Sequence, residues 1–181
     1  MISIQQQKRL LRAEIRQRKA EIPFEEKKII SAKIWKELEE LEIFKKAKCI
    51  LFYWSMSDEV HTHDFIDSCV SEKKIILPSV DGDRLLLRQY RGKQDLIPGD
   101  IYRIPEPSGP VFKEIDKIDL IVVPGVAFDS EGNRMGRGRA YYDKLLRSKT
   151  CPKIGVGFKI QILDEIPHDE LDVKMDIIIH E

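Results

Sequence analysis

Hydrophobic residues recur with the period of an α-helix along the first forty positions of the chain. Leu11 and Ile15 lie one turn apart and predict a helix over residues 4–20. Pro23 suits the first turn of a second helix, because an N–H group would have no helical partner there. This second helix continues to about residue 41 on four apolar residues, which are Ile29, Ile30, Ile34 and Leu38.

Short unbroken apolar runs replace this helical period further along the chain and predict buried strands. The runs lie at residues 49–54, 74–78, 119–125, 153–158 and 175–180. We expect helices at 62–72 and 138–147, a strand or a helix at 84–90, and mostly loop at 91–117. Strands that alternate with helices predict a single α/β domain over residues 1–181. Its mixed, largely parallel sheet would be flanked by helices on both faces, in a Rossmann-like three-layer arrangement.

Composition disfavours several classes of protein. The 181 residues include 31 Lys and Arg against 31 Asp and Glu, so the bulk charge does not indicate nucleic-acid binding. No apolar run approaches the roughly 20 residues of a membrane span. The three cysteines form no C-x-x-C, which disfavours a disulfide framework or a zinc site. We therefore expect a cytoplasmic protein, and we expect a monomer.

Charge is nevertheless concentrated at the two ends of the chain. Residues 1–20 carry six basic residues and one acidic residue, whereas residues 164–181 carry seven acidic residues and one basic residue. This opposition suits a site that binds an anion together with a metal. Lys8 and Arg12 lie one helical turn apart and could close over an anion, although a solvated basic face is the commoner explanation. Nucleic-acid binding by the same helix is a third alternative, but no aromatic residues interleave with the charges.

Residues 132–146, GNRMGRGRAYYDKLL, place three arginines in a glycine-rich segment between a predicted strand and a predicted helix. Glycines let backbone N–H groups approach an anion, and arginine forks add bidentate bonds to phosphate oxygens. The segment matches no general phosphate-loop motif, so a solvated turn that opens a helix is an equal alternative. Asp143 could hold a metal on the phosphates or simply favour the first turn of the helix. Tyr141 and Tyr142 point to different sides of that helix, and ordinary packing is the commoner role for each.

Residues 54–63, WSMSDEVHTH, follow the first predicted strand at its carboxyl end, where α/β sheets bind ligands. Glu59 could accept hydrogen bonds from the N–H groups of a heterocycle, and Trp54 could stack on its ring. Met56 could line the same pocket. Alternatively, an acidic or hydroxyl side chain of this segment, Asp58 or Thr62, caps the next helix.

Five segments of the chain carry a more specific signal when they are taken together. The longest is VPGVAFDSEGNRMGRGRAYYDKLL at residues 123–146, and the others are KRLLR at 8–12, DEVHT at 58–62, IPEP at 104–107 and PHDELDVKMDIIIHE at 167–181. In their order along the chain, the five segments resemble the 5-formyltetrahydrofolate cyclo-ligases, also called methenyltetrahydrofolate synthetases. The longest segment is similar to the family signature PG-x-AFD-x-x-G-x-R-[LM]-GRG-x-G-YYD. The five segments span nearly the whole chain, so the set is far more specific than any one of them.

The resemblance implies an enzyme that uses ATP and Mg²⁺ to convert 5-formyltetrahydrofolate to 5,10-methenyltetrahydrofolate, with release of ADP and phosphate. In this chemistry the formyl oxygen is phosphorylated and N10 then attacks. The residues implied to contact ATP are Lys8, Arg9, Arg12, Arg134, Met135, Gly136, Arg137, Gly138, Arg139, Ala140, Tyr141 and Tyr142. Asp143 and Asp172 match magnesium positions, and the predicted folate contacts are Trp54, Met56, Glu59 and Tyr141. The catalytic prediction falls on Arg137 and Tyr142.

Four positions depart from the family pattern, namely His61, Ala140, Leu171 and His180. Ala140 stands where the family usually has glycine, and because alanine resists positive φ, we expect ordinary backbone angles there. None of the four removes a residue assigned to ATP or magnesium. Two rival functions stay open, a sugar-phosphate isomerase-like enzyme of the same architecture and an RNA-binding protein that uses the basic N-terminal helix.

Overall fold

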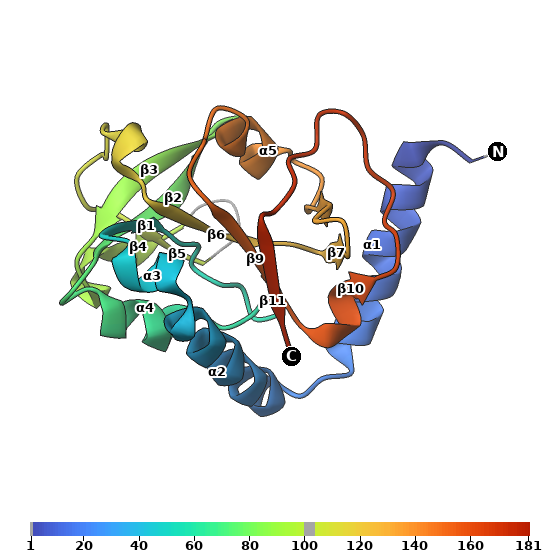
Figure 1. Ribbon diagram of the computed structural model, residues 1–181, viewed down its shortest axis with the longest axis horizontal. Coiled ribbons are helices and arrows are strands. Elements are labelled where there is room, and N and C mark those ends of the chain that lie inside the picture. Colours follow the sequence, from blue (N-terminus) through green and yellow to red (C-terminus); the bar gives the residue numbers. More distant parts are fainter. Residues whose placement is uncertain (1, 100–103) are drawn as a thin grey trace.

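The computed structural model describes residues 2–99 and 104–181, and Figure 1 shows its layers. Its α-helices are α1 (Ile4–Ala20), α2 (Phe24–Glu40), α3 (Glu42–Lys46), α4 (His63–Cys69) and α5 (Tyr141–Leu146). The strands of the main sheet are β1 (Cys49–Leu51), β2 (Lys74–Asp81), β3 (Arg84–Tyr90), β6 (Leu120–Pro124), β9 (Lys153–Gly157) and β11 (Ile177–His180). Smaller sheets contain β4 (Leu96–Pro98), β5 (Pro105–Pro107), β7 (Ala127–Asp129), β8 (Arg134–Met135) and β10 (Ile162–Leu163). Short 3₁₀ turns lie at Lys93–Asp95, Ile115–Lys117 and Lys159–Gln161.

The main sheet has the strand order β11-β9-β6-β1-β2-β3. Every neighbouring pair is parallel except β2 and β3, which form an antiparallel hairpin at one edge. The predicted mixed, largely parallel sheet is therefore confirmed. Because β1 and β6 are central and parallel, their carboxyl ends open at the same edge of the sheet.

Apolar side chains alternate between the two faces of the sheet and so divide into two cores. Ile50 and Val122 pack with α2, α3 and α4 on one face, whereas Leu51 and Val123 pack with Leu146 of α5 on the other. Strands covered on both faces need apolar residues at consecutive positions, which explains the unbroken runs in the sequence. The expected three-layer α/β class is confirmed. Among the described residues, no helix has the length and apolar character needed to cross a membrane.

Helix α1 lies apart from these layers and packs on the small sheet of β7, β8 and β10 (Figure 1). Its start is fixed by a capping box, in which Ser3 and Gln6 satisfy each other's backbone N–H groups. Ile15 is fully buried against Val126 and Ile166, so one face of α1 belongs to the interior.

Several predicted boundaries are corrected by the structure. The strand expected over 49–54 ends at Leu51, because the chain then leaves the sheet as a loop to α4. The helix expected over 138–147 begins only at Tyr141, since Gly138 and Ala140 have left-handed or glycine-like backbone angles. The helix expected at 62–72 is four residues shorter, and the strands expected at 153–158 and 175–180 are one and two residues shorter. Residues 84–90 form a strand, and the region expected as loop contributes the short pair β4 and β5.

Candidate active site

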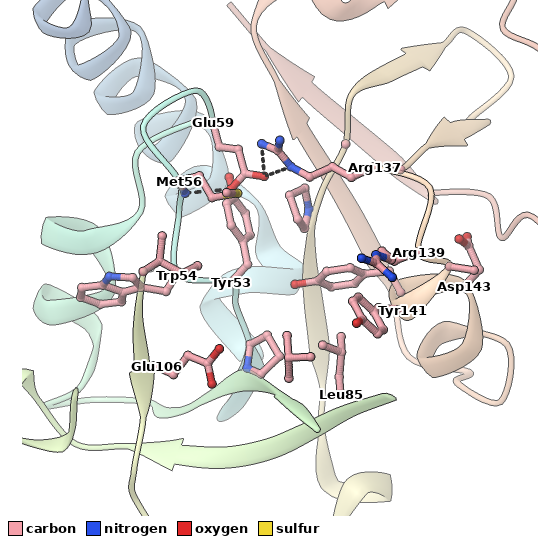
Figure 2. A pocket seen from close by; sticks show the side chains of 18 of the residues that line it. Tyr53, Trp54, Met56, Glu59, Leu85, Glu106, Arg137, Arg139, Tyr141 and Asp143 are labelled. Carbon is pink, nitrogen blue, oxygen red and sulfur yellow. Dashed lines mark hydrogen bonds and ion pairs between the residues drawn. The ribbon is translucent and has the colours of Figure 1, made fainter. Parts of the chain in front are cut away.

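A cavity opens at the carboxyl edge of the sheet, beyond the ends of β1 and β6 (Figure 2). It contains about 910 Å³ of space, its open mouth included. One wall is apolar and comes from the β2–β3 hairpin, with Pro78, Val80 and Leu85. Aromatic and charged residues of other elements complete the lining, and they include Tyr53, Trp54, Glu59, Glu106, Arg134, Arg137, Arg139, Tyr141, Tyr142 and Asp143. This is the position at which open α/β sheets bind ligands.

The loop that follows β1, here called the acidic loop (residues 55–62), is held by its own hydrogen bonds. The backbone N–H of Ser55 donates to Oγ1 of Thr62, and the N–H of Thr62 donates to Oγ of Ser55, both at 3.0 Å. Oη of Tyr53 donates to the carbonyl of Val60 at 2.9 Å. The helix-capping interpretation is wrong, because no side chain caps the start of α4. The loop instead presents Glu59 to the cavity from a fixed backbone.

Glu59 and Arg137 meet across the top of the cavity in Figure 2. Oε1 of Glu59 accepts hydrogen bonds from Nε and Nη2 of Arg137, at 3.1 and 3.0 Å, while Oε2 accepts the N–H of Met56 at 2.9 Å. Nη2 of Arg137 also donates to Oδ1 of Asp58 at 2.5 Å. Burial alone would lower the pKa of Arg137, but Glu59 and Asp58 outweigh it and the pKa is raised. Glu59, which was predicted to contact folate, therefore lies in direct contact with Arg137, which was predicted to contact ATP.

The segment that carries Arg137, here called the basic loop (residues 134–140), has an unusual backbone. Gly138 has φ of +101°, and Ala140 has φ of +54° and ψ of +19°, in the left-handed region. The expectation of ordinary angles at Ala140 is therefore wrong. The loop turns from β8 into α5 over very few residues, and this turn requires a left-handed residue at the position where the family pattern has glycine.

Arg134 lies at the start of the basic loop and is only 3% exposed. Nη2 donates to Oδ1 of Asp143 at 2.8 Å, and Nη1 donates to the carbonyl of Pro124 at 3.2 Å. The guanidinium also lies over the ring of Tyr142, 5.7 Å from its centre. Arg134 therefore joins the loop to β6 and α5, and its predicted contact with ATP stays a prediction.

The predicted magnesium residues are each paired with a cation. Asp143 lines the cavity and uses Oδ1 for Arg134, while Oδ2 accepts no hydrogen bond from the residues that the structure describes. Asp172 uses Oδ2 for Lys8 and for the N–H of Asp169. Within residues 2–99 and 104–181, no group of three or more acidic, histidine or cysteine side chains could hold a metal. Asp143 keeps one carboxylate oxygen without a hydrogen bond from the described residues, and a single carboxylate of this kind is a ligand that Mg²⁺ takes together with phosphates.

Helix α1 brings the basic amino end of the chain against the acidic carboxyl end. Lys8 is 5% exposed, and its Nζ donates to Asp169 at 2.8 Å and to Asp172 at 2.5 Å. Nε of Arg12 donates to the carbonyl of Gly136 in the basic loop at 2.8 Å. The solvated-face interpretation is wrong for Lys8. Arg9, in contrast, is exposed and makes no hydrogen bond or ion pair with the described part of the chain.

Three aromatic residues that were predicted to contact ligands, Trp54, Tyr141 and Tyr142, also make contacts within the protein. Trp54 is 7% exposed and stacks on His63, with ring centres 4.0 Å apart, while its Nε1 has no hydrogen-bond partner among the described residues. His63 therefore covers one face of the Trp54 indole, on which a ligand ring was expected to stack. Tyr142 packs on both cores of the sheet, and Oη of Tyr141 donates to the carbonyl of Gly82 at the tip of the β2–β3 hairpin.

Sequence reasoning missed the roles of two residues. Lys19 is buried and pairs with Asp58 at 2.7 Å, so the two link α1 to the acidic loop. Positions 8, 12, 15 and 19 share one face of a helix, and the buried Ile15 marks that face as interior. This spacing could have indicated from the sequence alone that Lys19 is buried. Asp169, the second partner of Lys8, had no comparable signal.

The fold and the cavity define an α/β protein with a charged, aromatic site at the carboxyl edge of a largely parallel sheet. The sequence model of the 5-formyltetrahydrofolate cyclo-ligase family matches residues 4–181, and the chain belongs to this family. The mouse 5-formyltetrahydrofolate cyclo-ligase is 31% identical over 99% of this chain and 96% of the relative. The probable 5-formyltetrahydrofolate cyclo-ligase of Schizosaccharomyces pombe is 32% identical over 82% of each chain.

Solved structures agree with this family. The 5,10-methenyltetrahydrofolate synthetase of Aquifex aeolicus superposes with a TM-score of 0.86 and is 32% identical, over 96% of this chain and 89% of that one. The corresponding synthetase of Mycoplasma pneumoniae gives a TM-score of 0.75 at 26% identity, over 95% and 97% of the chains. The predicted family resemblance is confirmed, and with it the assignment of the chain as a ligase.

Proposed function

We propose that this protein cyclises 5-formyltetrahydrofolate to 5,10-methenyltetrahydrofolate with the consumption of ATP, in the presence of Mg²⁺. The observation that carries the proposal is the contact between Glu59 and Arg137 at the cavity wall. It joins a carboxylate suited to the N–H groups of a pterin to a guanidinium suited to phosphate oxygens. The proposed substrate appears in the name of the mouse relative, and the proposed product appears in the name of the A. aeolicus relative.

The chemistry explains why phosphate and folate must share one site. A formamide oxygen is a poor leaving group, so it first attacks the γ-phosphorus of ATP, and the bond from phosphorus to the ADP oxygen breaks. The formyl carbon is then linked to N5 as an iminium and carries a phosphate. N10 attacks this carbon, the carbon–oxygen bond breaks to release phosphate, and N10 loses its proton. Phosphoryl transfer of this kind depends mainly on positioning and on charge neutralisation.

Arg137 is the residue of this chain best placed to neutralise the transferring phosphoryl group. Its pKa is raised by Glu59 and Asp58 against the effect of burial, so it stays charged at any physiological pH. Tyr142 borders the same cavity, and burial raises its pKa, which keeps the phenol protonated and neutral. A neutral hydroxyl can donate a hydrogen bond to a developing negative charge without adding charge of its own. We assign these two residues to catalysis.

Folate recognition is assigned to the acidic loop and to the apolar wall opposite it. Glu59 would accept hydrogen bonds from ring N–H groups, with Met56 and Trp54 beside it and Tyr141 across the cavity (Figure 2). Leu85 closes the far side, and a dry wall of this kind protects the phosphorylated intermediate from hydrolysis.

ATP is assigned to the groove between α1 and the basic loop. Arg12 already contacts the carbonyl of Gly136 there, and Lys8 lies one turn earlier on the same helix. Asp143 and Asp172 would hold the magnesium ion, which neutralises phosphate charge when it is bound. Because Lys8 is paired with Asp169 and Asp172, ATP would compete with these carboxylates for the ammonium group.

The proposal is tested by mixing the purified protein with 5-formyltetrahydrofolate, MgATP and buffer, and following the methenyl product by its absorbance. Product is expected in equal amounts with ADP and phosphate, and none is expected when ATP is replaced by ADP or when EDTA removes the metal. Folded protein that forms no methenyl product from ATP would contradict the proposal. Product formation without ATP would contradict the phosphorylation step.

A further inference from the structure

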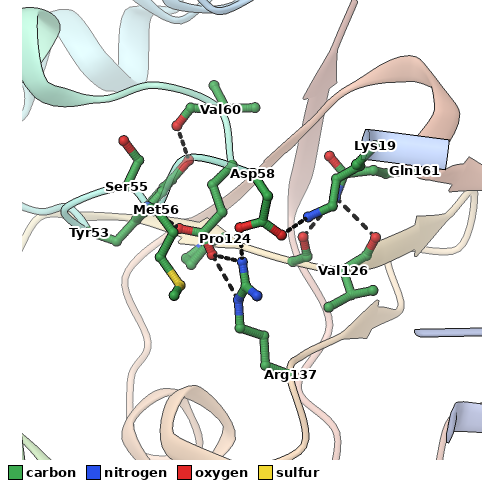
Figure 3. Close-up of polar contacts among 12 residues, drawn as sticks. Lys19, Tyr53, Ser55, Met56, Asp58, Val60, Pro124, Val126, Arg137 and Gln161 are labelled. Atoms are coloured by element: carbon green, nitrogen blue, oxygen red, sulfur yellow. Dashed lines mark hydrogen bonds and ion pairs between the residues drawn. The ribbon is translucent and has the colours of Figure 1, made fainter. Parts of the chain in front are cut away.

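A chain of ion pairs that begins at the buried Lys19 connects α1 to the basic loop through the half-buried Asp58 of the acidic loop (Figure 3). Lys19, in the last turn of α1, is 2% exposed, and its Nζ donates to Oδ2 of Asp58 at 2.7 Å. The other oxygen of Asp58, Oδ1, accepts from Nη2 of Arg137 at 2.5 Å. Asp58 thus lies between two cations that belong to segments far apart in the sequence.

From this geometry we infer that Lys19 is a positioning residue, which holds Asp58 so that Asp58 holds Arg137. The kinetic consequence of the inference rests on the proposed function, whereas the structural link does not. Neither Lys19 nor Asp58 lines the large cavity, and neither is among the residues assigned to folate or ATP, although both border a small cavity between α1 and Arg137.

The burial of Lys19 indicates that its charge serves a specific contact. A buried ammonium group is costly unless it is paired and hydrogen-bonded. Burial lowers the pKa of Lys19, and Asp58 only partly offsets this effect. An apolar residue at position 19 would avoid the cost and would suit a helix face that already buries Ile15. Docking of α1 alone therefore does not explain a lysine at this position.

Asp58 and Glu59 divide the task of holding Arg137 between them. Glu59 faces the large cavity, where the proposed function requires its oxygens for the folate ring. When Glu59 turns toward a ligand, Asp58 is the remaining carboxylate on Arg137. Asp58 and Lys19 both border a second, small cavity, which Arg12, Arg16 and Val126 also line. Without Lys19 the carboxylate would be free to rotate into this space, and Arg137 would lose its fixed partner.

The structural link is tested first in the ligand-free protein by NMR of the Arg137 Nη2 amino group, which donates to Asp58 and is identified by the signals missing in Arg137→Lys. Lys19→Met is expected to increase the rate of hydrogen exchange of this group about tenfold, because its bonded state is less populated. Lys153→Met is the matched control, since Lys153 is also a buried lysine near a single carboxylate, 3.9 Å from Asp176, at the opposite edge of the sheet. It should leave the Arg137 signal unchanged. Equal exchange rates in both variants would overturn the inference without any reference to catalysis.

The second test is a double-mutant cycle on turnover. Lys19→Met is expected to lower kcat by about tenfold to a hundredfold, with a smaller change in KM, as for other losses of positioning. Lys19→Arg should recover most of the rate, because it keeps the charge beside Asp58. In the Arg137→Met background, Lys19→Met should have no further effect on kcat, since its action runs through Arg137. Additive losses would overturn the inference.

The outcomes also separate this inference from the proposed function. A wild-type protein that forms no methenyl product contradicts the proposed function, and the NMR test then decides the link between Lys19 and Arg137 alone. If Lys19→Met does not fold, Asp58→Asn breaks the same link from its middle without a change in α1. Asp58→Asn with unchanged Arg137 exchange and unchanged kcat would overturn the inference equally.

Discussion

The acidic loop and the basic loop form facing walls of one cavity, but they are stabilised in different ways. The acidic loop is closed by hydrogen bonds between its own residues, such as the reciprocal pair of Ser55 and Thr62, and side chains of α1 and α2 add contacts to Asp58 and His61. The basic loop depends on contacts from elsewhere, including Arg12 on the carbonyl of Gly136 and Asp58 with Glu59 on Arg137. The backbone of the acidic loop is therefore closed in part by its own residues, whereas the conformation of the basic loop depends on its partners.

The difference between the loops has an energetic counterpart. Short polar side chains satisfy the backbone of the acidic loop locally, as is typical of serine and threonine in turns. The basic loop instead includes Ala140 in the left-handed region, which an L-residue adopts only at a cost. Substitution of Glu59 in the acidic loop should therefore alter recognition, while changes to the Arg134–Asp143 ion pair and to Ala140 of the basic loop should alter stability.

The largest expected effect comes from removal of the side chain that joins the two loops. Arg137→Ala should lower kcat/KM by about 10³-fold, the lower range for an arginine that stabilises phosphoryl transfer. Stability should change less than activity, because the Arg137 side chain is 37% exposed and its ion pair with Asp58 is partly exposed to solvent. Activity is measured by the methenyl assay and stability by thermal unfolding. Arg18→Ala removes an exposed arginine paired with Glu14 on α1 and serves as the control. Comparable losses of folding and activity would assign Arg137 a structural role instead.

The second prediction concerns the buried ion pair between Arg134 and Asp143, which joins the basic loop to α5. Asp143→Asn leaves Arg134 buried without a charged partner and should lower the free energy of unfolding by about 3 kcal/mol. Urea denaturation measures the change. The control, Asp83→Asn, alters an exposed carboxylate paired with Lys144 and should stay within about 0.5 kcal/mol of the wild type. Equal free energies of unfolding for the two variants would show that the ion pair of Arg134 and Asp143 does not stabilise the basic loop.

The sequence predicted the sheet better than it predicted the site. Apolar runs such as 119–125 located the central strands, because strands covered on both faces need apolar residues at every position. The ends of elements were less accurate, since neighbouring strands and loop closure decide them. The helix expected from residue 138 begins at Tyr141 for this reason, as Gly138 and Ala140 are taken up by the turn.

Within the site, the residue types were predictable, but several of their contacts were not. Glu59 and Arg137 were both candidates for ligand binding, and nothing in a linear sequence placed them in contact with each other. Lys8 resembled a member of a solvated stripe because its acidic partners lie more than 150 positions away. Ala140 misled for a different reason. Alanine is a poor left-handed residue, and the surrounding contacts impose that conformation despite its preference.

A smaller effect compares the two acidic residues within the acidic loop. Glu59→Gln keeps the shape of the side chain but weakens its acceptor, so KM for 5-formyltetrahydrofolate should rise about tenfold. KM for ATP should change little, because Glu59 is not assigned to the nucleotide. Steady-state kinetics with each substrate varied in turn measure both values. Asp58→Asn should show the opposite pattern, a lower kcat with a nearly unchanged folate KM. An equal rise in both KM values for Glu59→Gln would contradict the folate assignment.

The smallest effect measures the strain in the basic loop directly. The left-handed conformation costs an L-residue about 1–2 kcal/mol, whereas glycine adopts it freely but loses roughly 0.5–1 kcal/mol more in backbone entropy on folding. Ala140→Gly should therefore raise the free energy of unfolding by about 0.5–1 kcal/mol and the Tm by roughly 2 °C. Ala32→Gly makes the same chemical change at an exposed position within α2 and should lower stability by about 1 kcal/mol. Opposite signs for the two variants would show that the basic loop, unlike the acidic loop, is held in place against its own backbone preference. A loss of stability in both would mean that Ala140 is not left-handed in solution, and the contrast between the loops would then rest on side-chain contacts alone.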